Sequence, residues 1–164
     1  MVPPMTNKLR LKAGDAEDLA VIAACLQDAR IPLREMAYLP EEKRFVAAFT
    51  RFRREKQKDP RDCEGLTECE AAVVFDGIEE VKHRGFADLD PARELSLLTI
   101  ATEPGRDRLI HIDLVFEGDA QIQLRTDAIA CRLDDFGEPQ RCRVTPCDHF
   151  ESEFWAQVQD GAKA

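Results

Sequence analysis

The feature that most constrains the fold is a regular alternation of residue types between positions 110 and 124. Apolar side chains occupy every second position on both sides of Gly118-Asp119, at Ile110, Ile112, Leu114, Phe116, Ile122 and Leu124. A period of two buries one face of a β-strand, and a glycine-containing turn between two such runs is typical of a β-hairpin. We therefore expect this chain to fold around antiparallel sheet.

Extended patterns recur along the rest of the chain. They predict strands near residues 9–13, 33–39, 45–52, 71–75, 78–84 and 94–102, and a loop over residues 54–69. Within residues 45–52, one face carries Phe45, Ala47 and Phe49, and the other carries Val46, Ala48 and Thr50. Because both faces hold apolar side chains, this strand is expected to be covered on both sides. Strands that follow one another without helices between them argue against a parallel α/β sheet.

Helical patterns occur towards both ends of the chain. Asp15 and Asp18 resemble a capping box ahead of an apolar stripe, which predicts a helix over about residues 15–29. Thr126 suits the start of a short helix with Ile129, Leu133 and Phe136 on one face. Asp148 and Glu151 resemble a second capping box before a last helix, whose apolar stripe is Phe150, Phe154, Trp155 and Val158.

These elements predict an α+β fold. We expect a curved, mostly antiparallel sheet or roll, comparable to a pleckstrin-homology-like roll, packed by an N-terminal helix and one or two C-terminal helices. A single domain is expected over residues 9–137, with a C-terminal extension containing a helix over residues 138–164.

Composition narrows the classes of function. The net charge of −9 disfavours binding to nucleic acid or to anionic membranes, because such ligands need a positive surface. No apolar run approaches the roughly 20 residues that cross a bilayer, and the first residues do not resemble a signal peptide. A cytoplasmic protein without a cofactor is therefore expected, with its six cysteines as free thiols.

Signatures of common catalytic sites are missing from the sequence. No two glycines lie closer than eight residues apart, which excludes dinucleotide-binding and phosphate-binding loops. Ser96 and Ser152 do not lie in a nucleophile elbow. His111 and Asp113 would share the outward face of a strand, where they could transfer protons in an enzyme with an unrecognised site. An ordinary solvated strand face is the alternative interpretation.

The sharpest chemical hypothesis is a metal site in the cysteine-rich C-terminal segment. Cys142, Cys147 and His149 lie close together in sequence, and Cys63 or Cys69 could add a thiolate. Structural zinc takes four such ligands, usually paired two to four residues apart. The spacing here is wider than in that pattern, so independent free cysteines are the alternative.

Positive charge is concentrated in one segment of this acidic chain. Between positions 44 and 61 the basic residues are Arg44, Arg51, Arg53, Arg54, Lys56, Lys58 and Arg61, against the acidic residues Glu55 and Asp59. The segment predicts a binding patch formed by Arg51, Arg53, Arg54, Lys56 and Lys58 for a protein partner or an anionic ligand. The alternative is a solvated edge strand that charge protects from aggregation.

Several runs resemble a bacterial family of unknown function, DUF2948. They are residues 11–29 with Leu26-Gln27-Asp28-Ala29, Tyr38-Leu39-Pro40, Val74-Phe75 with Val81, Leu95-Ser96-Leu97-Leu98, and the hairpin that continues to Leu133-Asp134-Asp135. The resemblance covers residues 9–137 and implies no activity. It directs attention to Gln27 and Asp28 as further binding candidates at the end of the first helix, where they could instead bond to backbone groups.

The sequence thus favours a non-enzymatic cytosolic binding or adaptor domain. Two alternatives stay open, namely a zinc- or thiol-dependent protein and an enzyme with an unrecognised site.

Overall fold

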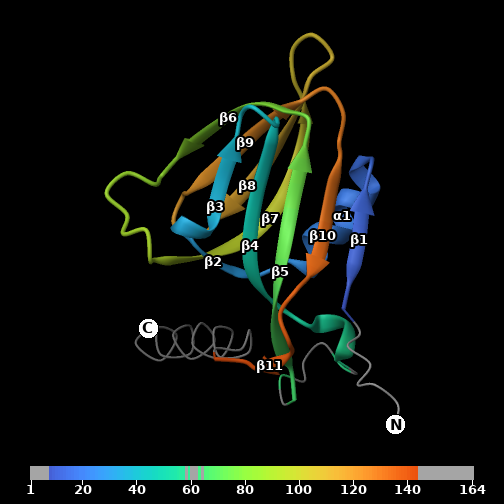
Figure 1. The fold of residues 1–164 in the computed structure, drawn as a ribbon, viewed down its shortest axis with the longest axis vertical. Helices are drawn as coiled ribbons and strands as arrows, with labels where there is room; N and C mark the ends of the chain where they lie inside the picture. Colours follow the sequence, from blue (N-terminus) through green and yellow to red (C-terminus); the bar gives the residue numbers. More distant parts are fainter. Residues whose placement is uncertain (1–7, 58, 60–62, 64, 144–164) are drawn as a thin grey trace, which may run out of the picture.

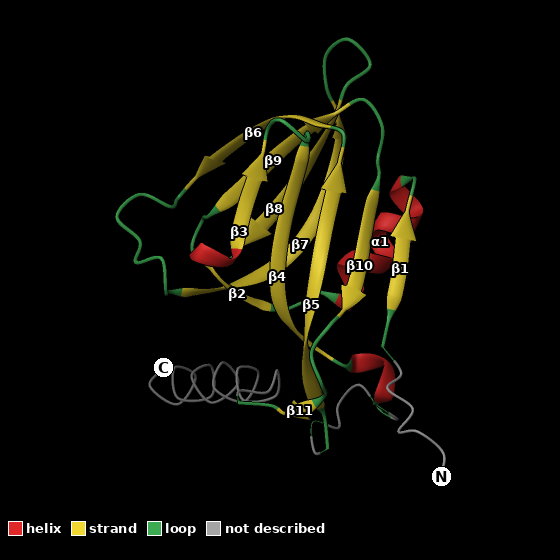
Figure 2. Ribbon diagram, viewed as in Figure 1, coloured by secondary structure: helices red, strands yellow, loops and turns green. Residues whose placement is uncertain are grey.

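Strands dominate the computed structural model, which describes residues 8–57, 59, 63 and 65–143. One α-helix, two short 3₁₀ helices and a sheet of eleven strands make up the regular structure of these residues. Figure 1 gives the arrangement of the elements, and Figure 2 shows how small the helical share is.

The elements have the following bounds. The helices are α1 (Ala16–Cys25), η1 (Leu33–Glu35) and η2 (Arg54–Lys56). The strands are β1 (Arg10–Ala13), β2 (Arg30–Pro32), β3 (Met36–Leu39), β4 (Arg44–Phe52), β5 (Thr67–Asp76), β6 (Ile78–Arg84), β7 (Glu94–Pro104), β8 (Ile110–Phe116), β9 (Gln121–Thr126), β10 (Cys131–Asp135) and β11 (Gln140–Arg141).

The sheet folds over into two layers. Its strand order is β1-β10-β5-β4-β2-β7-β8-β9-β6, and β3 and β11 pair with β4 and β5 beside this path. We call β1, β10, β5, β4 and β3 the front layer, and β7, β8, β9 and β6 the back layer (Figure 1). Strand β2 links them, because Arg30 pairs with Thr50 of β4 and with Ser96 of β7.

A single glycine carries the chain from the front layer to the back layer. Gly77 separates β5 from β6 and has a φ of 73°, in the left-handed region that glycine adopts without strain. The Thr126 hydroxyl donates to the Gly77 carbonyl oxygen at 2.9 Å and thereby joins this bend to the end of β9.

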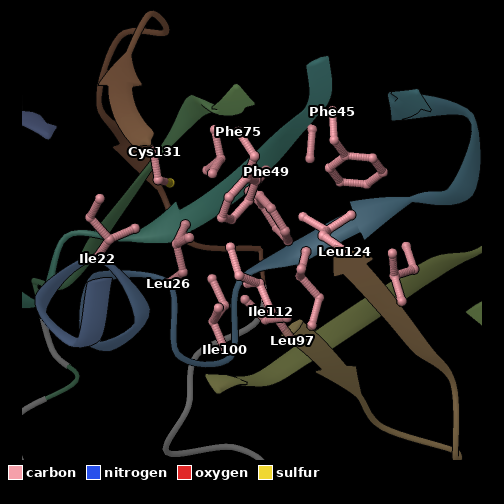
Figure 3. Close-up of a cluster of buried hydrophobic side chains, with 14 of the residues drawn as sticks. Ile22, Leu26, Phe45, Phe49, Phe75, Leu97, Ile100, Ile112, Leu124 and Cys131 are labelled. Atoms are coloured by element: carbon pink, nitrogen blue, oxygen red, sulfur yellow. The ribbon is translucent and has the colours of Figure 1, made fainter. Parts of the chain in front are cut away.

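The core lies between the layers and under α1. Phe49 and Phe75 point inwards from the front layer and Leu97 and Ile112 from the back layer, while Ile22 enters from α1 (Figure 3). All are almost completely buried, and each large apolar side chain removed from water contributes about 1.5–3 kcal/mol. Helix α1 contacts both β1 and β7, so it covers the side of the roll between them.

The hairpin predictions are confirmed. The alternating residues around Gly118 form β8 and β9, and β8 also pairs with β7. The strands predicted near residues 33–39 and 45–52 are found as β3 and β4, which pair with each other, and the 3₁₀ turn η1 precedes β3. The loop expected at residues 54–69 is shorter, because η2 occupies its start and β5 begins at Thr67.

The α+β class is wrong, because the described residues form a mostly antiparallel sheet with a single α-helix. The helix expected after Thr126 is strand β10, which alternates Cys131, Leu133 and Asp135 inwards. The first helix ends at Cys25 rather than near residue 29, and the chain turns at Asp28, whose φ is 63°. The last predicted helix lies outside the described residues.

Within the described residues, no helix has the length and apolar character needed to span a bilayer.

Two glycines with positive φ provide a test of the packing between β6 and the β8–β9 turn. A Cβ on Gly85 would lie 2.8 Å from the Ala120 Cα atom, whereas a Cβ on Gly118 would meet no atom within 4 Å. Gly118→Ala should cost about 1–2 kcal/mol for the left-handed backbone, and Gly85→Ala at least ~1 kcal/mol more for the steric overlap. Urea unfolding measures both, and equal losses would contradict the described packing.

Candidate binding site at a buried arginine

Arg51 is the most unusual residue of the core. Its side chain is completely buried at the end of β4, on the inward face that Phe45, Ala47 and Phe49 also occupy. An ionised guanidinium tolerates burial only where its charge is paired and its hydrogen bonds are satisfied. The inward position therefore requires acidic partners.

Two carboxylates and one carbonyl satisfy all five N–H donors of Arg51. Nε and Nη2 donate to the two oxygens of Asp135 at 2.8 and 2.7 Å. Nη1 and Nη2 donate to the two oxygens of Glu55 at 3.0 and 2.8 Å, and Nη1 also donates to the Phe52 carbonyl at 3.2 Å. Paired bonds of this kind hold the planar guanidinium in one orientation.

The network joins segments that are far apart in sequence. Asp135 is the last residue of β10, and its Oδ2 atom also accepts a hydrogen bond at 2.8 Å from the Leu9 backbone N–H, just before β1. Glu55 lies in η2, immediately after β4. Arg51 thus ties η2 to the ends of three strands in the front layer.

The charges of this network are stabilised in the folded protein. Burial opposes ionisation of Asp135, but the hydrogen bonds from Arg51 and Leu9 outweigh it and hold the pKa of that carboxyl below its ordinary value. Burial likewise opposes ionisation of Glu55, and the hydrogen bonds from Arg51 leave its pKa lowered. The pKa of Arg51 is raised, because its bonds to both carboxylates exceed the cost of burial.

A second ion pair lies on the outward side of the same strand ends. Arg30 of β2 pairs with Glu68 of β5, whose side chain is fully buried. The guanidinium groups of Arg30 and Arg54 lie over the ring of Phe52, at 5.8 and 5.7 Å from its centroid. Glu68 also accepts a hydrogen bond at 2.8 Å from the Arg143 backbone N–H, which fixes the residues that follow β11 to the start of β5.

The structure places part of the predicted basic patch at one location. Arg54 donates to the Asp28 carboxylate at 2.9 Å and to the Gln27 carbonyl oxygen at 3.4 Å, so the end of α1 meets η2. Arg53 donates to the Thr67 hydroxyl at 3.1 Å, and Lys56 is exposed.

Arg51 lies apart from this exposed group, because its side chain points into the core. Lys58 lies outside the described residues.

The predicted metal ligands are not brought together within the described part of the chain. Cys147 and His149 lie outside it, and the Cys142 thiol donates to the Leu66 carbonyl oxygen at 3.3 Å. No group of three or more metal-binding side chains occurs among the described residues. The expectation of free thiols is wrong for Cys63, which is disulfide-bonded, and is confirmed for Cys25, Cys69, Cys131 and Cys142.

His111 and Asp113 lie on the outward face of β8, as their spacing predicts. His111 Nδ1 is 3.7 Å from Glu103 Oε1, and Asp113 accepts a hydrogen bond at 3.0 Å from the Gln123 side-chain amide. The amide of Gln123 also reaches Glu103 at 3.3 Å. This is a polar network across β7, β8 and β9, in which Asp113 is buried by its neighbours.

Sequence reasoning missed Asp135, Glu68 and Arg30 as members of buried ion pairs. The one available signal was the alternation of β4, which assigns Arg51 to the same face as Phe49. A charged residue at such a position implies a partner, but Asp135 lies 84 positions further along the chain, and no sequence pattern links the two residues.

The fold and the network define a small β-roll with an ionised arginine held between two carboxylates at one end of its core. The sequence model of the family described as "Protein of unknown function (DUF2948)" matches residues 9–148, so the chain belongs to that family. The resemblance predicted from the sequence is confirmed, and the family's function is unknown. No curated protein and no solved structure matches the chain.

Removing the arginine tests its structural role. Arg51→Met keeps much of the side-chain volume but leaves the buried Asp135 carboxylate without its main partner, which should cost about 3–5 kcal/mol. Arg44→Met, on the exposed face of the same strand, removes a 2.7 Å ion pair with Asp76 and should change stability far less. Urea unfolding at pH 7 compares the two, and similar losses would contradict the role of Arg51.

The lowered pKa of Asp135 also predicts how stability depends on pH. A carboxyl with a lowered folded-state pKa stabilises the protein above its ordinary pKa of 3.8, and this contribution is lost as the pH falls through the folded-state value. Asp135→Asn should therefore be much less stable than the wild type at pH 7, with the difference shrinking below about pH 4. Asp134→Asn, an exposed neighbour, is the control. A pH-independent difference for Asp135→Asn in urea unfolding would contradict the assignment.

Proposed function

We propose that this protein is a non-enzymatic cytosolic binding domain that engages an acidic segment of a protein partner through η2 and the adjoining end of α1. The observation that carries the proposal is the attachment of η2 to the core. Glu55, the middle residue of η2, forms two hydrogen bonds with the buried Arg51 guanidinium. The basic residues around Glu55, namely the half-buried Arg53 and Arg54 and the exposed Lys56, are thus held on a fixed backbone.

The outward charge of η2 is positive. The acidic group of Glu55 is paired with Arg51, and Asp28 is paired with Arg54. Arg53 contacts the neutral Thr67 hydroxyl, and Lys56 is exposed. A fixed turn with two such cations supports binding to a carboxylate-rich segment.

The buried ionisable groups support binding rather than acid–base chemistry. The pKa of Asp135 and of Glu55 is lowered, whereas a general acid or base works best with a pKa near neutral pH. Burial raises the pKa of Cys69 to about 11 and that of Cys131 to about 12, which keeps these thiols protonated at pH 7 and unsuited to nucleophilic attack.

A double charge reversal tests this function. Arg53→Glu with Lys56→Glu should reduce recovery of the partner at least tenfold when the tagged full-length protein is purified from its own cells, because two attractive contacts become repulsive. In the wild type, cross-linking mass spectrometry should join Lys56 to an acidic peptide of that partner.

The matched control is Arg93→Glu with Arg106→Glu, which changes the net charge equally at exposed positions elsewhere. Equal losses in both double variants, or cross-links that avoid Lys56, would overturn the proposal. Circular dichroism verifies that each variant is folded.

A further inference from the structure

The two layers of the sheet present different outward faces. The outward face of the back layer is mostly polar. It carries the exposed Glu103 and the half-buried His111, Gln121, Gln123 and Arg125, beside one exposed apolar side chain, Leu98. This is the usual outer face of an antiparallel sheet whose inner face is buried.

The centre of the front layer is apolar on its outward face. Val46 of β4 lies opposite Val74 of β5, and Ala48 opposite Ala72, with Ala37 of β3 beside Val46. These side chains are incompletely buried. No helix of the described residues crosses the front of β4 and β5 in Figure 1. An uncovered apolar area in the middle of a sheet indicates a binding surface.

A groove of about 330 Å³ continues this surface towards the end of the described chain. Its lining includes Ala48 and Thr50 of β4 and Phe136, whose side chain is 50% exposed. Arg143, the last described residue, lines the same groove and forms a 2.8 Å ion pair with Glu94. The chain therefore leaves the described structure at one end of the apolar face.

We propose that the outward face of β3, β4 and β5 binds the chain's own C-terminal segment, residues 148–158. The sequence of this segment predicts a helix with a single apolar face, composed of Phe150, Phe154, Trp155 and Val158. The side chains of that stripe are large, and those at the centre of the sheet face are small. The sheet face thus allows a helix to approach closely.

The dimensions of the segment match those of the face. Eleven helical residues extend about 16 Å, and β4 extends about 20 Å between Arg44 and Thr50. Four residues separate Arg143 from position 148, and an extended chain of that length spans roughly 13 Å. A helix of this length can therefore cover most of the strands beyond the groove.

Charge also favours this occupant. Residues 148–160 contain four acidic residues and no Lys or Arg. The apolar face is flanked on its β1–β10 side by Arg10 and Lys12 of β1 and by Arg132 of β10, which pairs with Asp76 and Asp134. The acidic side of the segment thus carries the charge opposite to that of Arg10 and Lys12 on β1.

The single tryptophan of the chain makes the proposal directly measurable. In the full-length protein, Trp155 should fluoresce at shorter wavelength than in urea and resist quenching by acrylamide. Ala72→Arg, at the centre of the face, should shift the emission towards that of the unfolded chain and restore quenching. Thr99→Arg, at an exposed position on β7 in the back layer, is the matched control and should leave both signals unchanged.

Several outcomes would overturn the proposal. One is Trp155 emission in the folded wild type equal to that in urea, and another is protected emission that Ala72→Arg leaves unaltered. Protection that disappears on dilution, together with a dimeric mass by light scattering, would assign the face to a second copy instead. If Ala72→Arg does not fold, Phe154→Asp in residues 148–158 is used instead and should produce the same changes in Trp155 emission and quenching. Far-ultraviolet circular dichroism verifies that the sheet is retained.

Discussion

The buried Arg51 guanidinium is the interaction on which one end of the roll depends. It fixes Glu55 of η2 and Asp135 of β10, and Asp135 in turn holds the backbone just before β1. A buried ion pair adds little net stability compared with an apolar substitute, because desolvation offsets much of the attraction. Its main effect here is on geometry, because only one arrangement of partners satisfies all five N–H donors of the planar guanidinium. The network therefore specifies where the ends of the front layer meet.

The hairpins of the sheet could be predicted from the sequence, because the alternation of apolar and polar residues is visible within a short stretch of chain. Residues 110–124 contain both strands and the turn of a hairpin, and β3 pairs with β4 across a similarly short connection. The order of the other strands was not predictable, because β5 pairs with β10 and β2 pairs with β7 across long stretches of chain. The candidate site was predictable only in part, for the same reason. The alternation of β4 could assign Arg51 to the buried face, but its partner Asp135 could be identified only from the folded structure.

The error in fold class came from an ambiguous spacing. Ile129 and Leu133 are four residues apart, which places them on one side of a helix and also on one side of a strand. The intervening Cys131 decides in favour of the strand, because it is buried beside them on the same face. Thr126 does not cap a helix but ends β9, and its hydroxyl accepts a hydrogen bond from the Ala128 N–H in the turn that leads to β10.

Strand β4 connects the two proposed surfaces. Its inward positions pass from Phe45 to Arg51 and so link the apolar core to the attachment of η2. Its outward positions include Val46 and Ala48, which a water-facing strand would replace by polar residues. With both faces apolar, β4 has the composition of a strand in a central layer. A helix packed on its outer face would make the front layer the middle of three layers, and small side chains at its centre would bring that helix close to the backbone of the sheet.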